Sequence, residues 1–218
     1  MSQPLLFDYW RSSASYRVRI ALHLKGVAFN SVSVDLARGA QHGDAHRARN
    51  PQGFVPLLEI DGQRLTQSLA IIAYLDATRP DPPLLPDDPA AAAAVQAMAL
   101  MIACDIHPLN NLRVLKYIEK HYSADIGIAG MNQAAWVWTW VGQGFAALEA
   151  LAAPHAGRFL FGDAPTLADI CLVPQMYNAR RFGVPLDDYP LLVRADAAAC
   201  ALPAFAAAHP DAIAAAQQ

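Results

Sequence analysis

The chain has 218 residues, enough for one large domain or two small ones with a buried core. Its formal net charge of −3 gives it no strong positive field, so we expect no binding to nucleic acid. Hydrophobic residues make up 55% of the chain and charged residues only 16%, below the roughly 25% of an average globular protein, which excludes disorder over most of the length.

The first part of the chain alternates between strand and helix patterns. A short buried strand is predicted at residues 5–9, and a helix at residues 15–25 that ends at Gly26, a residue suited to a left-handed helix cap. A second strand is predicted at residues 29–36, where apolar residues alternate. This order is that of a βαβ unit.

Two more strands are predicted after a looser segment. They take residues 57–60 and 64–66 and flank the pair Asp61-Gly62, which is typical of hairpin turns. Gln67 and Ser68 then open a helix, with Ser68 as its expected N-cap. The order βαβ-ββα over residues 1–80 predicts a thioredoxin-like domain.

Proline interrupts the chain after this domain. Five of the ten residues 80–89 are proline, which can continue neither a helix nor a central strand, so we place a linker at residues 81–89. Residues 90–218 are rich in alanine with helical periodicity and predict an all-helical domain. The predicted fold class is therefore α/β plus all-α.

Three long helices are expected in this second domain. One covers residues 90–122 with a kink at Pro108, and another covers residues 132–153. The third begins at Thr166, where Asp169 completes a capping box, and it ends near Arg181. Prolines divide the remaining tail into short helices.

The segment between the first strand and the first helix carries the first candidate site. Arg11, Ser12 and Ser13 place a cation and two hydroxyls beside the unpaired N–H groups of a helix start, which suits an anion. The alternative is that Ser12 only caps the helix, as serine often does.

Two later segments are expected to meet this one. A cis peptide at Val55-Pro56 would present backbone groups to an extended peptide, and the helix start at Gln67-Ser68 favours a carboxylate. No cysteine precedes Cys104, so the domain has no dithiol of its own. A bound thiol peptide, for which glutathione is the natural candidate, would supply the missing sulfur.

Several segments across nearly the whole chain resemble the zeta class of the glutathione transferases, a family that includes maleylacetoacetate and maleylpyruvate isomerases. The run from Arg11-Ser12-Ser13-Ala14-Ser15 to Leu22 and the segment at residues 105–113 are specific to this class, and residues 172–175 also resemble a segment of the family. Val55-Pro56 and Gln67-Ser68 recur throughout glutathione transferases. One departure is Ala14, where the family often has cysteine, so inactivation through a thiol at that position is excluded.

The resemblance implies a role for each matching residue. Ser12 would meet the glutathione sulfur and stabilise its thiolate, and Arg11 and Arg181 would bind and activate a small acidic maleyl substrate. The residues that it implies for glutathione binding are Ser12, Ser13, Gln41, Val55, Gln67, Ser68, His107, Asn111 and Arg113.

The implied activity is a glutathione-dependent cis–trans isomerisation of maleylacetoacetate, or of maleylpyruvate, by reversible addition of a thiolate to the double bond. Two alternatives stay open. One is conjugation by a general glutathione S-transferase, or dehalogenation of α-halo acids, and the other is a non-catalytic module that recruits partners through the helical domain.

Some of these features have a purely structural interpretation. His107 could fill the kink before Pro108, and Arg180 is expected only to offset the dipole of its helix. For Trp136, Trp138 and Trp140 we expect packing in the core or in a dimer.

Other classes of site and compartment are not indicated. No pattern of metal ligands occurs, and no uninterrupted apolar run reaches the ~20 residues that a membrane helix needs. The N-terminal residues do not resemble a secretion signal, and three widely spaced cysteines fit reduced thiols. We therefore expect a cytoplasmic homodimer with no metal and no membrane partner.

Overall fold

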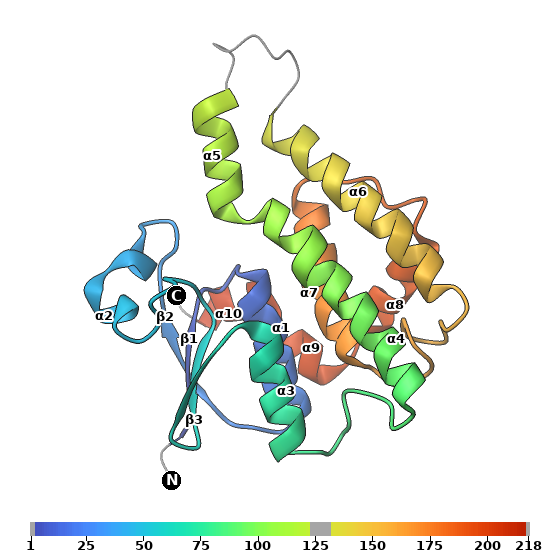
Figure 1. The fold of residues 1–218 in the computed structure, drawn as a ribbon, viewed down its shortest axis with the longest axis horizontal. Coiled ribbons are helices and arrows are strands. Elements are labelled where there is room, and N and C mark those ends of the chain that lie inside the picture. Colours follow the sequence, from blue (N-terminus) through green and yellow to red (C-terminus); the bar gives the residue numbers. More distant parts are fainter. Residues whose placement is uncertain (1–2, 123–131, 217–218) are drawn as a thin grey trace. The chain divides into compact units, whose positions relative to one another are not determined.

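The computed structural model of the protein describes residues 3–122 and 132–216 (Figure 1). The chain divides into two units. The first runs to Pro83 and resumes at Ala201, and the second is Leu84–Cys200. By its contacts the chain divides after Pro83, and its last residues join the first unit. The linker expected at residues 81–89 and the helical domain expected at 90–218 stay predictions.

A four-stranded sheet forms the centre of the first unit. Its strands are β1 (Leu5–Asp8), β2 (Asn30–Ser33), β3 (Leu57–Ile60) and β4 (Gln63–Thr66), in the spatial order β2-β1-β3-β4. β2 runs parallel to β1, whereas β3 is antiparallel to both β1 and β4. The predicted βαβ-ββα order is confirmed. β2 is shorter than expected, and its four residues are exposed because it is an edge strand.

Helices cover both faces of this sheet. Asp8 points to α1 (Ser13–Leu24), because its carboxylate accepts two hydrogen bonds of 2.8 Å from Arg19, and α3 (Ser68–Thr78) packs beside α1. Phe7 points to the other face, since successive strand residues alternate, and there it meets His46 of α2 (Asp44–Arg47). The sheet is therefore packed on both sides.

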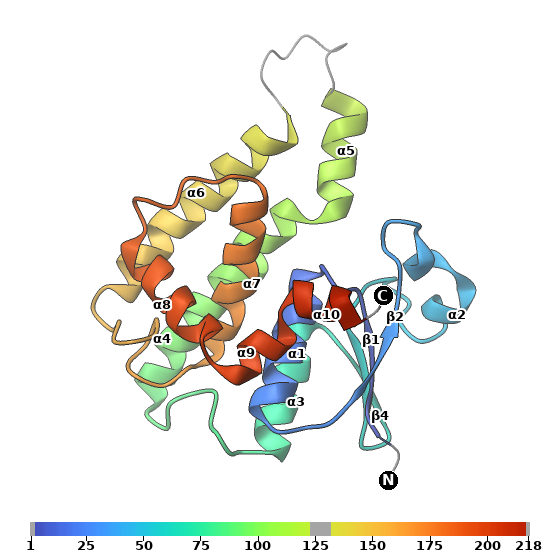
Figure 2. The same ribbon diagram turned by 180° about the vertical axis from the view of Figure 1, so that it is seen from behind.

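The C-terminal helices belong to this unit through α1. α9 (Pro203–Ala208) lies beside α1, and α10 (Pro210–Ala216) packs against α9 (Figure 2). The fully buried guanidinium of Arg19 donates through Nε to the carbonyl of Ala208 at 3.0 Å. A buried charge must be paired and hydrogen-bonded, so Arg19 requires both Asp8 and this distant carbonyl.

The second unit consists of helices. They are α4 (Pro89–Leu100), a π-helical turn (Met101–Ile106), a 3-10 turn (His107–Asn110), α5 (Leu112–Tyr122), α6 (Gln133–Ala152), α7 (Leu167–Arg181) and α8 (Pro190–Cys200). The predicted interruption at Pro108 is confirmed, because a 3-10 turn separates α4 from α5. The predicted capping box is also present, with Thr166 and Asp169 bonded to each other's backbone.

By length and composition alone, the helical run Pro89–His121 could cross a membrane, with a mean hydropathy of 1.6 over 18 residues. This differs from the expectation that polar residues break every such run. In the structure, Val95, Met98 and Ala99 of α4 are fully buried, and α4 packs against α7. These three apolar residues of α4 therefore pack inside the second unit, although only 28% of the 18-residue window is buried.

The tryptophans of α6 were expected to pack in the core or in a dimer. The structure does not place them in the core, and packing in a dimer stays a prediction. Trp138 is 46% exposed, and Trp136 and Trp140 are only half-buried. The buried stripe of α6 consists instead of Val137, Val141, Phe145, Leu148 and Ala152.

Candidate functional site

The register of the sheet brings three predicted segments of the first unit to one edge. Ser12 follows the end of β1, where Phe7 pairs with Leu57, and Leu57 begins β3 directly after Val55-Pro56. Leu57 also pairs with Thr66, the last residue of β4, so the start of α3 follows at the same edge. The strand pairing therefore gathers the expected binding segments.

Ser12 is the N-cap of α1. Its Oγ accepts a hydrogen bond of 3.3 Å from the backbone N–H of Ser15, and its own N–H donates to Tyr9 at 2.8 Å. The helix therefore begins at Ser13, two residues before the predicted start. A hydroxyl that accepts one bond still has its hydrogen to donate, so the capping role and a role toward an anion are compatible.

Arg11 and Ser13 flank this cap. The Arg11 side chain is exposed, with its guanidinium carbon 5.2 Å from the centre of the Trp10 ring, while Ser13 is half-buried in the first turn of α1. No acidic residue occurs in that first turn. The start of α1 therefore combines the positive end of a helix dipole with a nearby cation.

The Val55-Pro56 peptide is cis, as predicted. The Val55 side chain is buried with Phe7, Val34 and Leu57 in a small apolar cluster beneath the edge of the sheet. This packing fixes the chain just before β3, which leaves the backbone of this segment as the part available to a peptide ligand.

Gln67, rather than Ser68, occupies the N-cap position of α3. Gln67 has a φ of 65°, a conformation unusual for a residue other than glycine. In the part of the chain that the structure describes, its side chain forms no capping hydrogen bond with α3. Its amide instead donates to Oε1 of Gln52 at 2.7 Å. By contrast, α1, α4, α6 and α7 each begin at a side chain that accepts from the first turn.

Ser68 is buried as the first residue of α3, and its hydroxyl has another use than capping. Its Oγ accepts a hydrogen bond of 3.2 Å from Nη1 of Arg17, a buried residue of α1. The positive charge of Arg17 therefore lies next to the start of α3, which lacks a side-chain cap. Such a helix start favours a carboxylate.

Gln41 lies in a 3-10 turn (Ala40–His42) next to the same edge. A Cβ atom on Gly53 would stand 3.1 Å from the Gln41 carbonyl, so only glycine allows the loop before Val55 to approach this turn so closely. Nε2 of Gln41 lies 3.2 Å from Nε2 of His42, and its buried Oε1 has no hydrogen-bond partner in the part of the chain that the structure describes. A buried carbonyl oxygen of this kind can accept from a ligand.

Three candidates for glutathione binding lie close together in the second unit. His107 begins the 3-10 turn, and Asn111 follows it and accepts at Oδ1 from the backbone N–H of Arg113 at 3.1 Å. Trp136 of α6 donates its indole N–H to the carbonyl of Leu109 at 2.8 Å, within the same turn. His107 and Asn111 are half-buried, and Arg113 is exposed.

Arg181 is the last residue of α7, and its guanidinium carbon lies 5.3 Å from the centre of the Phe182 ring. Its neighbour Arg180 forms an ion pair of 2.6 Å with the buried carboxylate of Asp196. Arg180 therefore has the structural role expected of it, although through Asp196 and not only through the helix dipole. The two adjacent arginines have different partners.

Asp169 of the second unit is a buried carboxyl with a raised pKa. Burial raises the pKa of this carboxyl from 3.8 to about 6, although its oxygens accept from the backbone N–H groups of Leu160 and Thr166 at 3.0 and 2.9 Å. These bonds join the start of α7 to the preceding loop, which confirms the structural role predicted for this segment.

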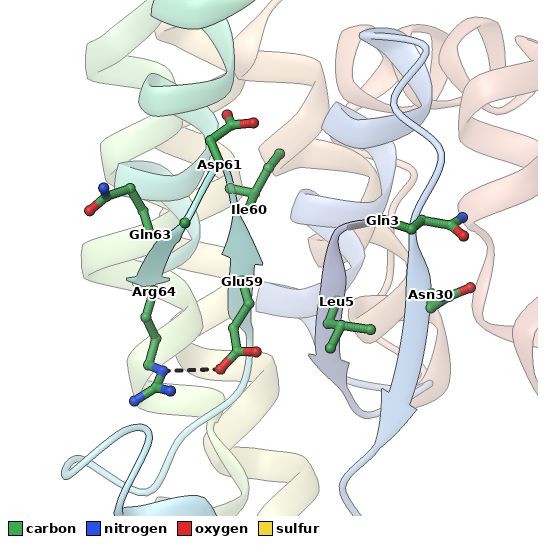
Figure 3. A pocket seen from close by; sticks show the side chains of 9 residues that line it. Gln3, Leu5, Asn30, Glu59, Ile60, Asp61, Gln63 and Arg64 are labelled. Carbon is green, nitrogen blue, oxygen red and sulfur yellow. Dashed lines mark hydrogen bonds and ion pairs between the residues drawn. The ribbon is translucent and has the colours of Figure 1, made fainter. Parts of the chain in front are cut away.

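A shallow depression of about 580 Å³ lies at the opposite edge of the sheet (Figure 3). Leu5 and Asn30, the first residues of β1 and β2, line it together with an ion pair of 3.0 Å between Arg64 and Glu59. Because Ser12 follows the other end of β1, this depression is not part of the candidate site. Among the described residues, no group of three or more His, Cys, Asp or Glu side chains could hold a metal ion.

Sequence reasoning missed the residues that support the candidate ones. Arg17 and Gln52 hydrogen-bond to Ser68 and Gln67. Trp136 and Trp138, two of the three tryptophans of α6, hydrogen-bond to backbone near other candidates. Arg17 gave a usable signal, because a charged residue in the apolar stretch 16–22 needs a buried partner. For Gln52, Trp136 and Trp138 no local signal exists.

Comparison with known proteins places these features in context. Residues 2–77 match the model of the glutathione S-transferase N-terminal domain. The chain is 50% identical over 211 residues to a maleylacetoacetate isomerase of Rhizobium meliloti (strain 1021). The alignment covers 96% of this chain and 97% of that protein.

The three cysteines form no disulfide with one another.

Two solved structures are similar over almost the whole chain. One is a holo maleyl pyruvate isomerase, described as a bacterial glutathione S-transferase in the zeta class, with 47% identity, a TM-score of 0.90 and coverage of 95% of this chain and 97% of that one. The other is a maleylacetoacetate isomerase from Anaeromyxobacter dehalogenans 2CP-1 with glutathione bound in its active site, with 44% identity, a TM-score of 0.85 and coverage of 96% of each chain.

Proposed function

Because the chain belongs to the zeta class of the glutathione transferases, we propose that it catalyses the glutathione-dependent cis–trans isomerisation of maleylacetoacetate, with maleylpyruvate as the alternative substrate. The observation that carries this proposal is the gathering of Ser12, Val55 and Gln67-Ser68 at one sheet edge. That edge offers a helix start for a thiolate, an extended segment for a peptide and a second helix start for a carboxylate.

These residues fit a thiol peptide with a carboxylate at its γ-glutamyl end. The uncapped start of α3 at Gln67 and Ser68 would bind that carboxylate, and the Val55 backbone would pair with the cysteinyl residue. The buried Oε1 of Gln41 is an acceptor for a ligand N–H. In the proposed site, Ser13 lies beside the sulfur, and His107, Asn111 and Arg113 contribute from the second unit.

Ser12 and the start of α1 would act on the sulfur. A free thiol has a pKa near ~8.5, and donation of the Ser12 hydroxyl hydrogen, together with the helix dipole, lowers it. Bound glutathione supplies the thiolate that adds to the double bond and leaves again, so that rotation takes place about a single bond. Ser12 thus stabilises an anion and does not itself attack.

Two arginines would act on the substrate. Addition to the double bond moves negative charge onto the conjugated carbonyl, and a cation at that oxygen stabilises the transition state more than the ground state. Arg11, which is exposed beside the α1 start, is proposed for this role. Arg181 is proposed to bind a substrate carboxylate through its planar guanidinium.

The test is a spectrophotometric assay of isomerisation of both maleyl substrates, with and without glutathione. The proposal expects turnover that requires glutathione and regenerates it. Turnover independent of glutathione, or none of either substrate, would contradict it. We further propose that the protein is cytoplasmic and forms a homodimer. Light scattering of the purified protein tests its oligomeric state.

A further inference from the structure

α6 connects the second unit's two groups of candidate residues through the indole N–H groups of two tryptophans. Trp136 donates to the carbonyl of Leu109 at 2.8 Å, and Trp138 donates to the carbonyl of Phe182 at 2.7 Å. Residues two apart on a helix point to nearly opposite sides, so these indoles reach different neighbours. The buried Val137 lies between them.

The Trp138 bond stabilises the end of the helix that carries Arg181. The last carbonyls of a helix lack partners within it. At the end of α7, the N–H groups of Gly183 and Val184 donate to Arg180 and Ala179, both at 3.0 Å, in the pattern of a Schellman motif. The carbonyl of Phe182, the C-cap residue, is bound by Trp138.

This hydrogen bond has no evident purpose in core packing. Trp138 is 46% exposed, yet its indole makes a short, directed bond to the residue that follows Arg181. Gly183, with a φ of 64°, leads the chain away beside the Trp138 ring. The Trp138 bond therefore holds the backbone next to Arg181, while the neighbouring Arg180 pairs with Asp196.

Trp136 has the same relation to the turn that carries the other candidates. Its bond to Leu109 fixes the middle of the turn His107–Asn110, between the side chains of His107 and Asn111. Its ring also contacts Trp140 edge to face, with centres 5.5 Å apart. The turn is short and contains a proline, so it has few backbone hydrogen bonds of its own.

We propose that Trp136 and Trp138 are positioning residues with separate effects: Trp138 orients Arg181 for the acidic substrate, and Trp136 orients the His107–Asn110 turn for glutathione. The inference rests on the proposed function. It assigns to one helix the independent placement of a substrate-binding and a cofactor-binding segment, each through a single side-chain-to-backbone hydrogen bond.

The experiment compares Trp138→Phe with Trp136→Phe in the full chain, measuring kcat and the KM for each ligand. Trp138→Phe is expected to raise the KM for the maleyl substrate about three- to tenfold and to leave the KM for glutathione unchanged. Trp136→Phe is expected to do the reverse. Tyr189→Phe is the matched control, because it removes a similar bond, of 3.1 Å, from a ring to the carbonyl of Gly142 on α6.

A second comparison separates positioning from folding. Benzothienylalanine at position 138 keeps the size of the indole but lacks its N–H group, and it should reproduce the effect of Trp138→Phe on the KM for the substrate. In an Arg181→Ala background, Trp138→Phe should have no further effect on that KM, because the two residues act as one unit.

Several outcomes would overturn the inference. Equal rises in both KM values, a fall in Tm or kcat alone, or additive effects of Trp138→Phe and Arg181→Ala would each mean that the tryptophans are only structural. If the wild type isomerises the maleyl substrate with glutathione and the tryptophan variants have the same kcat and KM values, only this inference fails. A wild type without glutathione-dependent turnover overturns the proposed function itself.

Discussion

The two units hold their candidate residues in different ways. In the first unit, strand pairing carries Ser12, Val55 and Gln67 to one edge, and backbone groups at helix starts make up much of the binding surface. In the second unit, the Trp138 side chain of α6 binds the backbone next to Arg181, and the Asp196 side chain of α8 pairs with Arg180. A binding surface made of backbone is insensitive to most substitutions, whereas one held by single side chains is not.

Removal of the Arg181 guanidinium tests the second unit most directly and has the largest expected effect. Arg181→Ala should raise the KM for the maleyl substrate about 100- to 1,000-fold, because a paired carboxylate loses a bidentate, charged partner. The KM for glutathione should not change. Steady-state kinetics with both ligands varied measure this, and an unaltered substrate KM would remove the proposed role.

Asp169 sharpens the comparison between helix starts, since α7 is capped by its own side chains and α3 is not. Its pKa is about 6 in the folded chain because of burial, against 3.8 as the ordinary value, so the folded state binds more protons between these pH values. The protonated Asp169 therefore adds about 3 kcal/mol to the free energy of unfolding below pH 3.8. This contribution is lost as the pH rises through 6.

A carboxyl ¹³C titration measures that pKa directly. In denaturant unfolding, the wild type should lose this contribution between pH 4 and pH 7, while Asp169→Asn, which cannot titrate, should show no such component. A titration midpoint near the ordinary value of an aspartate would contradict the prediction.

For the first unit, Ser12→Ala tests whether the backbone N–H groups at the start of α1 are enough to stabilise the thiolate of bound glutathione. The variant should raise the pKa of the thiol of bound glutathione by about one unit and lower kcat near neutral pH about tenfold, because one hydrogen bond to the thiolate is lost. Ultraviolet absorbance of the thiolate follows the pKa. Ser31→Ala, in the exposed edge strand β2, serves as the control, and an identical pKa in Ser12→Ala and the wild type would assign the effect to the helix start alone.

Substitution of Arg180 has the smallest expected effect, and it is compared with the substitution of its neighbour Arg181. Arg180→Gln should leave both KM values unchanged and reduce the free energy of unfolding by about 1 kcal/mol, because the buried Asp196 loses an ion pair that is partly exposed on the arginine side. Urea unfolding measures the loss. A rise in substrate KM as large as that of Arg181→Ala would end the distinction between the two arginines.

Prediction from sequence worked where the physical cause lies within a few residues. The hairpin at Asp61-Gly62, the interruption at Pro108 and the capping box at Thr166 were all predicted correctly, because turn, proline and cap chemistry act locally. Ser68 was assigned wrongly as an N-cap, because Arg17, 51 residues away, takes its hydroxyl. The bond from Arg19 to the carbonyl of Ala208 in the tail had no local signal, because the two residues are 189 positions apart.

The amino-acid sequence by itself determined the order of strands and helices, the residue types at each helix start and the absence of a cysteine before Cys104 that makes a borrowed sulfur necessary. Only the tertiary structure decided which helix start lacks a side-chain cap, that Arg180 pairs with the buried Asp196, and which tryptophans bind backbone instead of filling the core. The reason is physical: propensities and caps act over one turn, whereas a buried charge or an indole N–H takes whichever partner the folded chain brings near.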